Sequence, residues 1–249
     1  MGTMEPRATE NWAEAADRDW TLRPMEIDDV ESVMAVIDAA DADLVRREGH
    51  PERPQPALEQ VEATRRGHGR FVARDGPGAW VAVAGDRVAG VAESIRREDF
   101  WGLSMLFIHP EFQSRGVGRE LLGAALGYGA GAKVRMIQSS PDFRAMRRYA
   151  QAGLAMHPAA DVYGVPERTA IPRTLLGRSG DTSDLELVAS VEAHIGRSRT
   201  EDVAFGIEGG SRLDVVDEGP RRGWMLWNPG RVVMLGATDE EIAANLLWR

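Results

Sequence analysis

A buried strand, a short glycine-bearing turn and the start of a helix are expected in immediate succession over residues 103–122, and no other feature constrains the fold as strongly. The apolar run of this stretch is typical of a buried strand, and Val117, Leu121 and Leu122 share one face of the helix that follows. Gly116 and Gly118 lack the Cβ atoms that would keep an anion away from the backbone amides. Because a helix N-terminus also offers unpaired N–H groups and a favourable dipole, the stretch predicts an anion site.

The motif Gln113-x-x-Gly116-x-Gly118, after a strand that ends in His109-Pro110, resembles the acyl-CoA motif of the GNAT N-acetyltransferase superfamily. In that family the loop amides hold the CoA pyrophosphate, and the strand before the loop hydrogen-bonds the pantetheine. The positions that the resemblance assigns to acetyl-CoA are Leu106, Phe107 and Ile108 on the strand and Gln113, Ser114, Arg115, Gly116, Val117, Gly118 and Arg119 in the loop.

Other interpretations of the glycine loop fit less well. A P-loop requires Lys-Ser or Lys-Thr after its last glycine, where this chain has Arg119-Glu120. A dinucleotide-binding fingerprint needs a third glycine and an acidic residue about twenty positions further on, and neither is in register. A helix start without a ligand stays an alternative, because glycines also mark ordinary turns.

The composition limits the class of protein. A chain of 249 residues with 43% hydrophobic content can bury one good core or two smaller ones. With no cysteine there is no thiol nucleophile, cysteine-ligated zinc or redox switch, which fits a cytoplasmic protein. Residues 1–18 lack the apolar core of a signal peptide, and no apolar run approaches the roughly eighteen residues of a membrane span.

The net charge of −9 disfavours nucleic-acid binding and mildly favours a cationic acceptor, although an acidic surface also simply keeps a chain soluble. The histidines His50, His68, His109, His157 and His194 show no ligand spacing with Asp or Glu. We therefore expect no metal site.

The first part of the chain predicts a polar segment over 1–19 and a catalytic domain over 20–165. Its expected elements are a strand at 21–24, helices at 27–47 and 57–66, strands at 79–84, 88–95 and 103–108, the motif helix, a strand at 133–138, a helix at 142–151 and a strand from Leu154. This order resembles the GNAT acyl-CoA N-acyltransferase fold, which is α/β (α+β) with a mixed sheet flanked by helices.

The second part predicts a linker over 166–182 and a partial domain over 183–249. Its expected elements are helices at 185–195 and 200–206, strands at 212–216, 222–227 and 231–235, and a helix at 239–248. They repeat the first part of the catalytic domain, which suggests a second, degenerate GNAT-like half. Acidic residues in its loop over 236–241 would repel a pyrophosphate, so we expect one CoA site. The chain stops within the last helix, so this half is either truncated or completed by strands of the first domain or of a partner, as in a homodimer.

The stretch from Arg147 to Leu154 resembles the family's second motif, in which a tyrosine commonly protonates the departing sulfur. Tyr149 is therefore our candidate general acid; the alternative is a ring that packs at a helix interface. Asp142 stands where relatives place an asparagine that orients the pantetheine or a water, and N-capping explains it equally well. Arg115, Arg119, Arg144, Arg147 and Arg148 form a basic cluster, part of which we expect on the CoA phosphates.

The general base is harder to place. Relatives often carry a glutamate on the strand before the second-motif helix, but Ile137 holds that position here. Glu93 shares strand parity with Val91 and Ile95 and should face an apolar environment, which raises a carboxyl pKa. We take Glu93 as the candidate base; the alternatives are pairing with an arginine, exposure, or a water chain that makes a base unnecessary.

These features predict an N-acyltransferase that moves an acetyl group from acetyl-CoA to the amine of a small molecule or peptide by direct attack in a ternary complex. The acceptor should lie between the helices at 27–66 and the face contributed by the second half, where Asp38, Asp41 and Asp43 can attract a cation. Two alternatives stay open: an acyl-CoA-binding sensor or scaffold without turnover, and acyl transfer from a carrier protein or an aminoacyl-tRNA.

Overall fold

The computed structural model describes residues 19–49, 51, 54–140, 142–158, 167, 169, 171 and 175–249. The polar segment expected over 1–19 and His50 therefore lie almost entirely outside the described residues. The chain divides into two compact units, one formed by the described residues up to Ala152 and the other by those from Gly153 onwards. Two short pieces, 97–100 and 132–134, group with the second unit.

A five-stranded sheet in the order β1-β2-β3-β4-β5 forms the centre of the first unit. The strands are β1 (Thr21–Pro24), β2 (Ala79–Ala84), β3 (Arg87–Arg97), β4 (Phe100–Ile108) and β5 (Val134–Ile137). A two-residue turn with Gly85 at φ 61° joins β2 to β3 and makes them antiparallel. A helix connects the neighbours β4 and β5, and such a crossover is typical of parallel strands, so the sheet is mixed.

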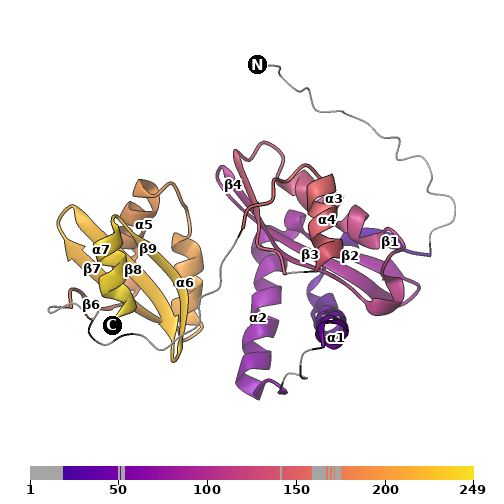
Figure 1. Cartoon of the computed structure of the whole chain (residues 1–249), viewed down its shortest axis with the longest axis horizontal. Helices are drawn as coiled ribbons and strands as arrows, with labels where there is room; N and C mark the ends of the chain where they lie inside the picture. The colour runs from indigo at the N-terminus through magenta and orange to yellow at the C-terminus, as the bar shows by residue number, and fades with distance from the viewer. Residues whose placement is uncertain are drawn as a thin grey trace, which may run out of the picture. The chain divides into compact units, whose positions relative to one another are not determined.

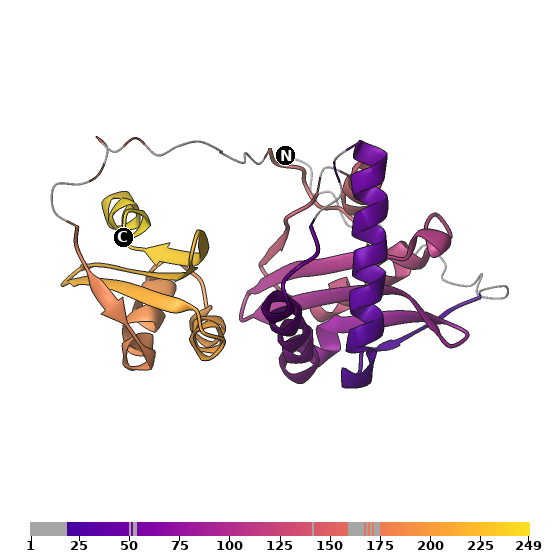
Figure 2. The same ribbon diagram turned by 90° about the horizontal axis from the view of Figure 1, so that it is seen from below.

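Two helices cover each face of this sheet (Figures 1 and 2). They are α1 (Val30–Glu48) and α2 (Leu58–Asp75) on one face and α3 (Val117–Tyr128) and α4 (Phe143–Gln151) on the other. The alternation of side chains along a strand decides which residues meet which helix. Val81 and Val91 form a core with Val33 of α1. Gly90 faces α3, where a Cβ would come within 3.0 Å of Leu121.

The second unit has a four-stranded sheet in the order β6-β7-β8-β9 (Figure 1). Its elements are β6 (Arg178–Gly180), α5 (Leu185–His194), α6 (Thr200–Glu208), β7 (Arg212–Glu218), β8 (Arg221–Asn228), β9 (Arg231–Ala237) and α7 (Glu240–Leu247). Trp224 and Leu226 of β8 form a core with α5 and α6. Met225, between them in sequence, packs against Ile242 of α7 on the opposite face. The order strand, two helices, three strands and helix repeats that of β1 to α3, consistent with a second GNAT-like half.

The largest differences between the elements of the structure and the sequence predictions lie in three places. Helix α2 runs to Asp75 instead of ending near residue 66, because Phe71 and Val72 pack into the core and outweigh the low helix propensity of Gly67 and Gly69. Residues 154–158, expected to open a strand, have no regular structure. Part of the expected linker is β6, an edge strand without an apolar side chain that pairs with β7 through its backbone.

Among the described residues, the helices are all too short or too polar to span a bilayer.

Candidate functional site

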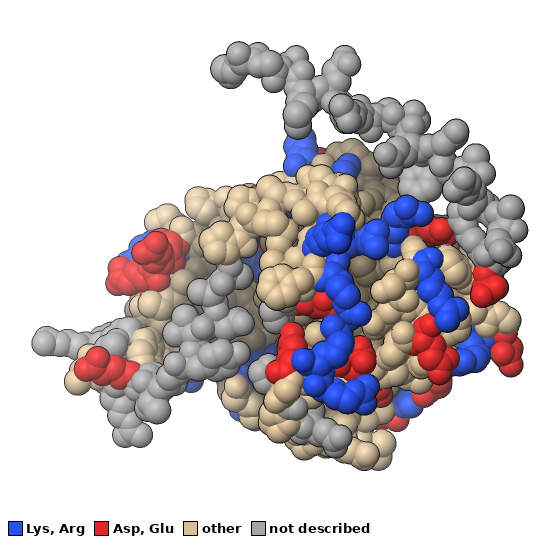
Figure 3. Space-filling model, turned by 45° about the vertical axis from the view of Figure 1, so that its right-hand side comes forward, with Lys and Arg blue, Asp and Glu red and all other residues tan. Residues whose placement is uncertain are grey.

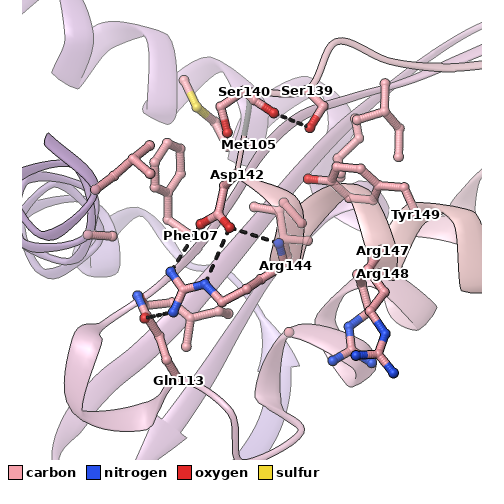
Figure 4. A pocket seen from close by; sticks show the side chains of 18 of the residues that line it. Met105, Phe107, Gln113, Ser139, Ser140, Asp142, Arg144, Arg147, Arg148 and Tyr149 are labelled. Carbon is pink, nitrogen blue, oxygen red and sulfur yellow. Dashed lines mark hydrogen bonds and ion pairs between the residues drawn. The ribbon is translucent and has the colours of Figure 1, made fainter. Parts of the chain in front are cut away.

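A cavity of about 830 Å³ opens in the first unit beside β4, and its lining comes from five parts of the chain. Strand β4 and the end of β5 contribute backbone and apolar side chains. The loop before α3, one side of α4 and one face of α1 complete the lining. Figure 4 shows this arrangement, with α1 on one side of the cavity and α4 on the other.

The glycine loop has the backbone conformation that an anion site requires. Ser114 and Gly116 adopt positive φ values of 64° and 99°, which turn the chain sharply between β4 and α3. Gly116 caps α3, and its carbonyl accepts from the amides of Arg119 at 2.9 Å and Glu120 at 3.3 Å. The amides of Val117 and Gly118, the first two of α3, precede the first intrahelical hydrogen bond, so they can bind an anion at the cavity wall.

The side chain of Gln113 fixes the start of this loop. Its Nε2 donates to the carbonyl of Ile108 at 3.0 Å, and its Oε1 accepts from Nη1 of Arg144 at 2.8 Å. The first contact holds the loop against the end of β4, and the second joins it to α4.

Asp142 caps α4 and accepts from the backbone amide of Arg144 at 2.9 Å. Its carboxylate also accepts from Nε and Nη2 of Arg144, at 3.3 and 3.0 Å, and from Nη2 of Arg47 at 3.3 Å (Figure 4 shows the Arg144 contacts). Burial favours the neutral acid, but the hydrogen bonds and charges of the two arginines outweigh it and lower the pKa of Asp142 to about 2. Asp142 is therefore an anion at neutral pH.

Tyr149 lies seven residues after Asp142, two helical turns along the same face of α4. Its side chain is only 7% exposed, and it borders the cavity. Burial, with a smaller effect of the Asp142 carboxylate, raises the pKa of Tyr149 to about 12. The phenol therefore keeps its proton at neutral pH and can donate it.

The cavity brings together most of the residues that the sequence singled out. Those on its wall are Leu106, Phe107, Ile108, Gln113, Ser114, Gly116, Gly118, Arg119, Asp142 and Tyr149. Val117 instead turns its side chain into the core, and Arg115 points away, over the ring of Phe112 and 4.0 Å from Asp19. Of these two residues, only the backbone can take part in the anion site of the loop.

Glu93 is fully buried on β3, and among the described residues it is not part of the cavity wall. Its Oε1 lies 2.7 Å from Nδ1 of His68 on α2, while Oε2 is buried without a hydrogen-bond partner in the described part of the chain. Burial raises the pKa of Glu93, against the opposing effect of His68.

The acidic residues that the sequence singled out on α1 do not lie on the wall of this cavity. Asp38 and Asp41 do not border the cavity, and Asp43 is paired with Arg46 at 3.4 Å and Arg47 at 2.9 Å. The α1 residues on the cavity wall are instead Ala40, Leu44 and Arg47. Sequence reasoning missed these three, because their i, i+4, i+7 spacing is also that of a core-facing stripe.

Basic side chains border the cavity around the loop. Arg119 comes from α3, and Arg144, Arg147 and Arg148 come from α4. On the side of the first unit turned forward in Figure 3, Lys and Arg side chains form a continuous band with acidic side chains beside it. Within the part of the chain that the structure describes, three or more His, Asp or Glu side chains nowhere gather as a metal site would require.

The fold and the cavity together define an α/β domain with a mixed sheet, in which a glycine loop between β4 and α3 borders the cavity. Residues 41–154 match the model of the acetyltransferase (GNAT) family. The chain therefore carries a GNAT acetyltransferase domain. A search of curated proteins finds no match.

Solved structures show the same fold at low sequence identity. A proposed acetyltransferase from Pyrococcus horikoshii is 17% identical, with a TM-score of 0.66 over 97% of this chain and 79% of that one. A GCN5-related N-acetyltransferase from Kribbella flavida is 18% identical, with a TM-score of 0.56 over 92% of this chain and 59% of that one. Both matches include the two halves of this sequence.

Proposed function

We propose that the first unit is an acyl-CoA-dependent N-acyltransferase that uses acetyl-CoA and an amine acceptor. The observation that carries the proposal is that one cavity is bordered by the glycine loop at one end of α3 and by the protonated phenol of Tyr149 on α4. The first can hold a pyrophosphate and the second can protonate a leaving thiolate. A pocket with both groups suits a CoA thioester better than a simple phosphate.

The proposed reaction is a direct attack. The neutral amine nitrogen forms a bond to the thioester carbonyl carbon, the carbon–sulfur bond breaks, and the sulfur takes the proton of Tyr149. In this proposal, backbone amides along β4 stabilise the developing oxyanion. The chain has no cysteine, so the acyl group does not pass through a protein thiol.

Removal of the amine proton is the less defined step. Glu93 does not border the cavity, so any action as the base must pass through water or through His68. Water at the cavity mouth can also accept the proton directly. A Glu93→Gln variant distinguishes these routes, because only the first loses rate.

Thermal unfolding with and without acetyl-CoA tests the donor. Acetyl-CoA at a hundredfold its Kd should stabilise the chain by about 2.7 kcal/mol, a rise in Tm of roughly 5–10 °C at this size. Gly118→Glu should abolish this rise, because its carboxylate would stand beside the loop amides. Gly123→Glu on the same helix is the matched control: a Cβ added at Gly123 would meet no atom within 4 Å, and Gly123 does not border the cavity, so the fold and the rise should persist.

An amine panel then tests the acceptor. Release of CoA that depends on an added amine supports the transferase. A Tm rise without turnover of any amine would instead favour a binding module without catalysis. No Tm rise with wild type would contradict acetyl-CoA as the donor.

A further inference from the structure

A continuous series of side-chain contacts joins the glycine loop to helix α1. Gln113 at the start of the loop accepts from Arg144 at 2.8 Å, and Arg144 donates to Asp142 at 3.0 Å. Asp142 accepts from Arg47 at 3.3 Å, and Arg47 donates to Asp43, one turn earlier on α1, at 2.9 Å. Arg47 and Asp142 are 95 residues apart in sequence, so this contact fixes α1 to the N-terminus of α4.

Asp142 is the shared member of this series. Its Oδ1 accepts from the amide and Nε of Arg144, and its Oδ2 accepts from Nη2 of Arg144 and Nη2 of Arg47. These four contacts use the full capacity of a carboxylate. Oδ2 is therefore a point at which two guanidinium groups compete for one oxygen.

Arg47 lies at the end of the α1 face that borders the cavity. Ala40, Leu44 and Arg47 form this face, and Arg47 is the one cation among them. Its side chain is 38% exposed, so the contact with Asp142 is accessible to solvent and contributes little to global stability. Such a contact can therefore strengthen or weaken on ligand binding at a small cost in free energy.

An anion bound in the glycine loop should displace the side chain of Arg144. Its guanidinium lies on the cavity wall beside Gln113, and an anion held by the loop amides attracts it. If Arg144 moves toward that anion, its hydrogen bond to Oδ2 of Asp142 is lost, and Arg47 becomes the remaining donor to this oxygen. The contact between α1 and α4 then becomes stronger.

We propose that Arg47 is a positioning residue of the transferase site: through Asp142 it transmits occupancy of the glycine loop to the face of α1 that borders the cavity. This inference rests on the proposed function, because it takes acyl-CoA as the ligand of the loop. In this inference Arg47 positions Ala40 and Leu44 on the cavity wall, and it does not touch the reacting atoms.

Hydrogen exchange of the full chain tests the inference with acetyl-CoA as the probe. Acetyl-CoA should slow amide exchange over residues 40–48 of wild type about fivefold, at the lower end of ordinary coupling between sites. Arg47→Met keeps the length of the side chain and removes its charge, and it should lose this protection while acetyl-CoA affinity stays within about twofold. Arg47→Lys should restore part of it, since an ammonium keeps the charge without the planar fork.

Arg46→Met is the matched control. Arg46 also pairs with Asp43, at 3.4 Å, but it is 73% exposed and does not border the cavity. Its loss should leave the acetyl-CoA-dependent protection unchanged. Thermal unfolding of each variant without ligand confirms that it folds.

The outcomes separate this inference from the proposed function. Protection over 40–48 that persists in Arg47→Met, or that never occurs although acetyl-CoA binds, overturns the role of Arg47. A tenfold loss of acetyl-CoA affinity in Arg47→Met would make Arg47 a ligand of the donor instead. If wild type shows no Tm rise with acetyl-CoA, the proposed function fails, and the inference fails with it.

Discussion

Arg178 holds the carboxylate of Asp184 through two hydrogen bonds of 2.9 and 2.5 Å at the start of the second unit. The same carboxylate accepts from the amide of Asp181 at 3.1 Å and so shapes the turn that leads from β6 into α5. The pair therefore fixes the angle at which the first helix leaves the edge strand.

The first unit contains the same arrangement. Arg23 donates to Asp29 at 2.6 and 2.7 Å, and Asp29 accepts from the amide of Glu26 at 2.8 Å. Both arginines lie six residues before their aspartate, on the first strand of a sheet and ahead of the first helix. Two turns built from the same contacts at the same spacing support the view that the second unit repeats the first.

Asp184→Ala should destabilise the second unit by about 1–2 kcal/mol, because a buried carboxylate that satisfies one amide and one guanidinium is lost. Calorimetric unfolding measures the loss, and hydrogen exchange of β7 and α5 assigns it to this unit. Hydrogen bonds from Arg178 lower the pKa of Asp184 below its ordinary 3.8. The stabilisation is therefore present above pH 4 and disappears as the pH falls through the folded-state pKa.

Asp217→Ala is the control for this prediction. Asp217 pairs with Arg222 at 2.9 Å, but its side chain is 50% exposed, so its loss should cost less than about 0.5 kcal/mol. Equal losses for Asp184→Ala and Asp217→Ala would argue against a structural role of the turn.

Gly116→Ala should weaken acetyl-CoA binding and destabilise the first unit by about 1–2 kcal/mol. The reason is conformational: Gly116 has φ 99°, while the nearest atom to an added Cβ is 4.0 Å away, on Trp20. Gly123→Ala in α3 is the matched control, since Gly123 has neither a positive φ nor an atom within 4 Å. It should stabilise the helix by about 0.5–1 kcal/mol, and thermal unfolding of both variants tests the contrast.

Most strands and helices of the first unit, and its loop, could be predicted because they depend on local sequence, whereas the length of α2 could not. β1 and β2 have the expected bounds, and the glycine loop lies between β4 and α3 as expected, with Gly116 as the N-cap of α3. The position of Asp142 as the N-cap of α4 could also be predicted, because capping is a short-range interaction.

Long-range partners could not be predicted in this way. Nothing in the sequence near Glu93 indicates that α2 brings His68 within 2.7 Å, since α2 had been expected to end before residue 68. The contact of Arg47 with Asp142 depends likewise on how α1 and α4 lie in the fold. The tertiary packing of the helices and strands decides such contacts, and the local secondary-structure propensity of the sequence does not.

Tyr149→Phe should reduce turnover by about 10²–10⁴, the ordinary contribution of a general acid, with acetyl-CoA affinity unchanged. Steady-state rates with the best amine of a panel, together with calorimetric binding of acetyl-CoA, make the measurement. Tyr128→Phe is the control: Tyr128 donates to Asp75 at 3.0 Å and does not border the cavity, so its loss should affect stability more than rate. An undiminished rate in Tyr149→Phe would exclude Tyr149 as the acid.

The pH dependence of the rate tests the same residue independently. Because the pKa of Tyr149 is raised to about 12, its phenol is still protonated at pH 10. The alkaline fall in kcat that depends on Tyr149 should therefore lie near pH 12 and not near pH 10. A fall centred at pH 10 in wild type that is absent in Tyr149→Phe would contradict the burial of the phenol.

Glu93→Gln should make the protein more stable than wild type at neutral pH, and the difference should depend on pH. Burial raises the pKa of Glu93 above its ordinary 4.5, so the folded state favours the neutral acid. The contribution of Glu93 to the stability of wild type is then largest below pH 4.5 and declines as the pH rises through the folded-state pKa, whereas an amide does not titrate. Urea unfolding at a series of pH values measures both proteins. A difference that stays constant from pH 4 to 8 would show that Glu93 titrates normally in the folded state. If the rate with an amine acceptor also falls in Glu93→Gln while stability rises, the carboxyl group acts in the reaction and not only in packing beside His68.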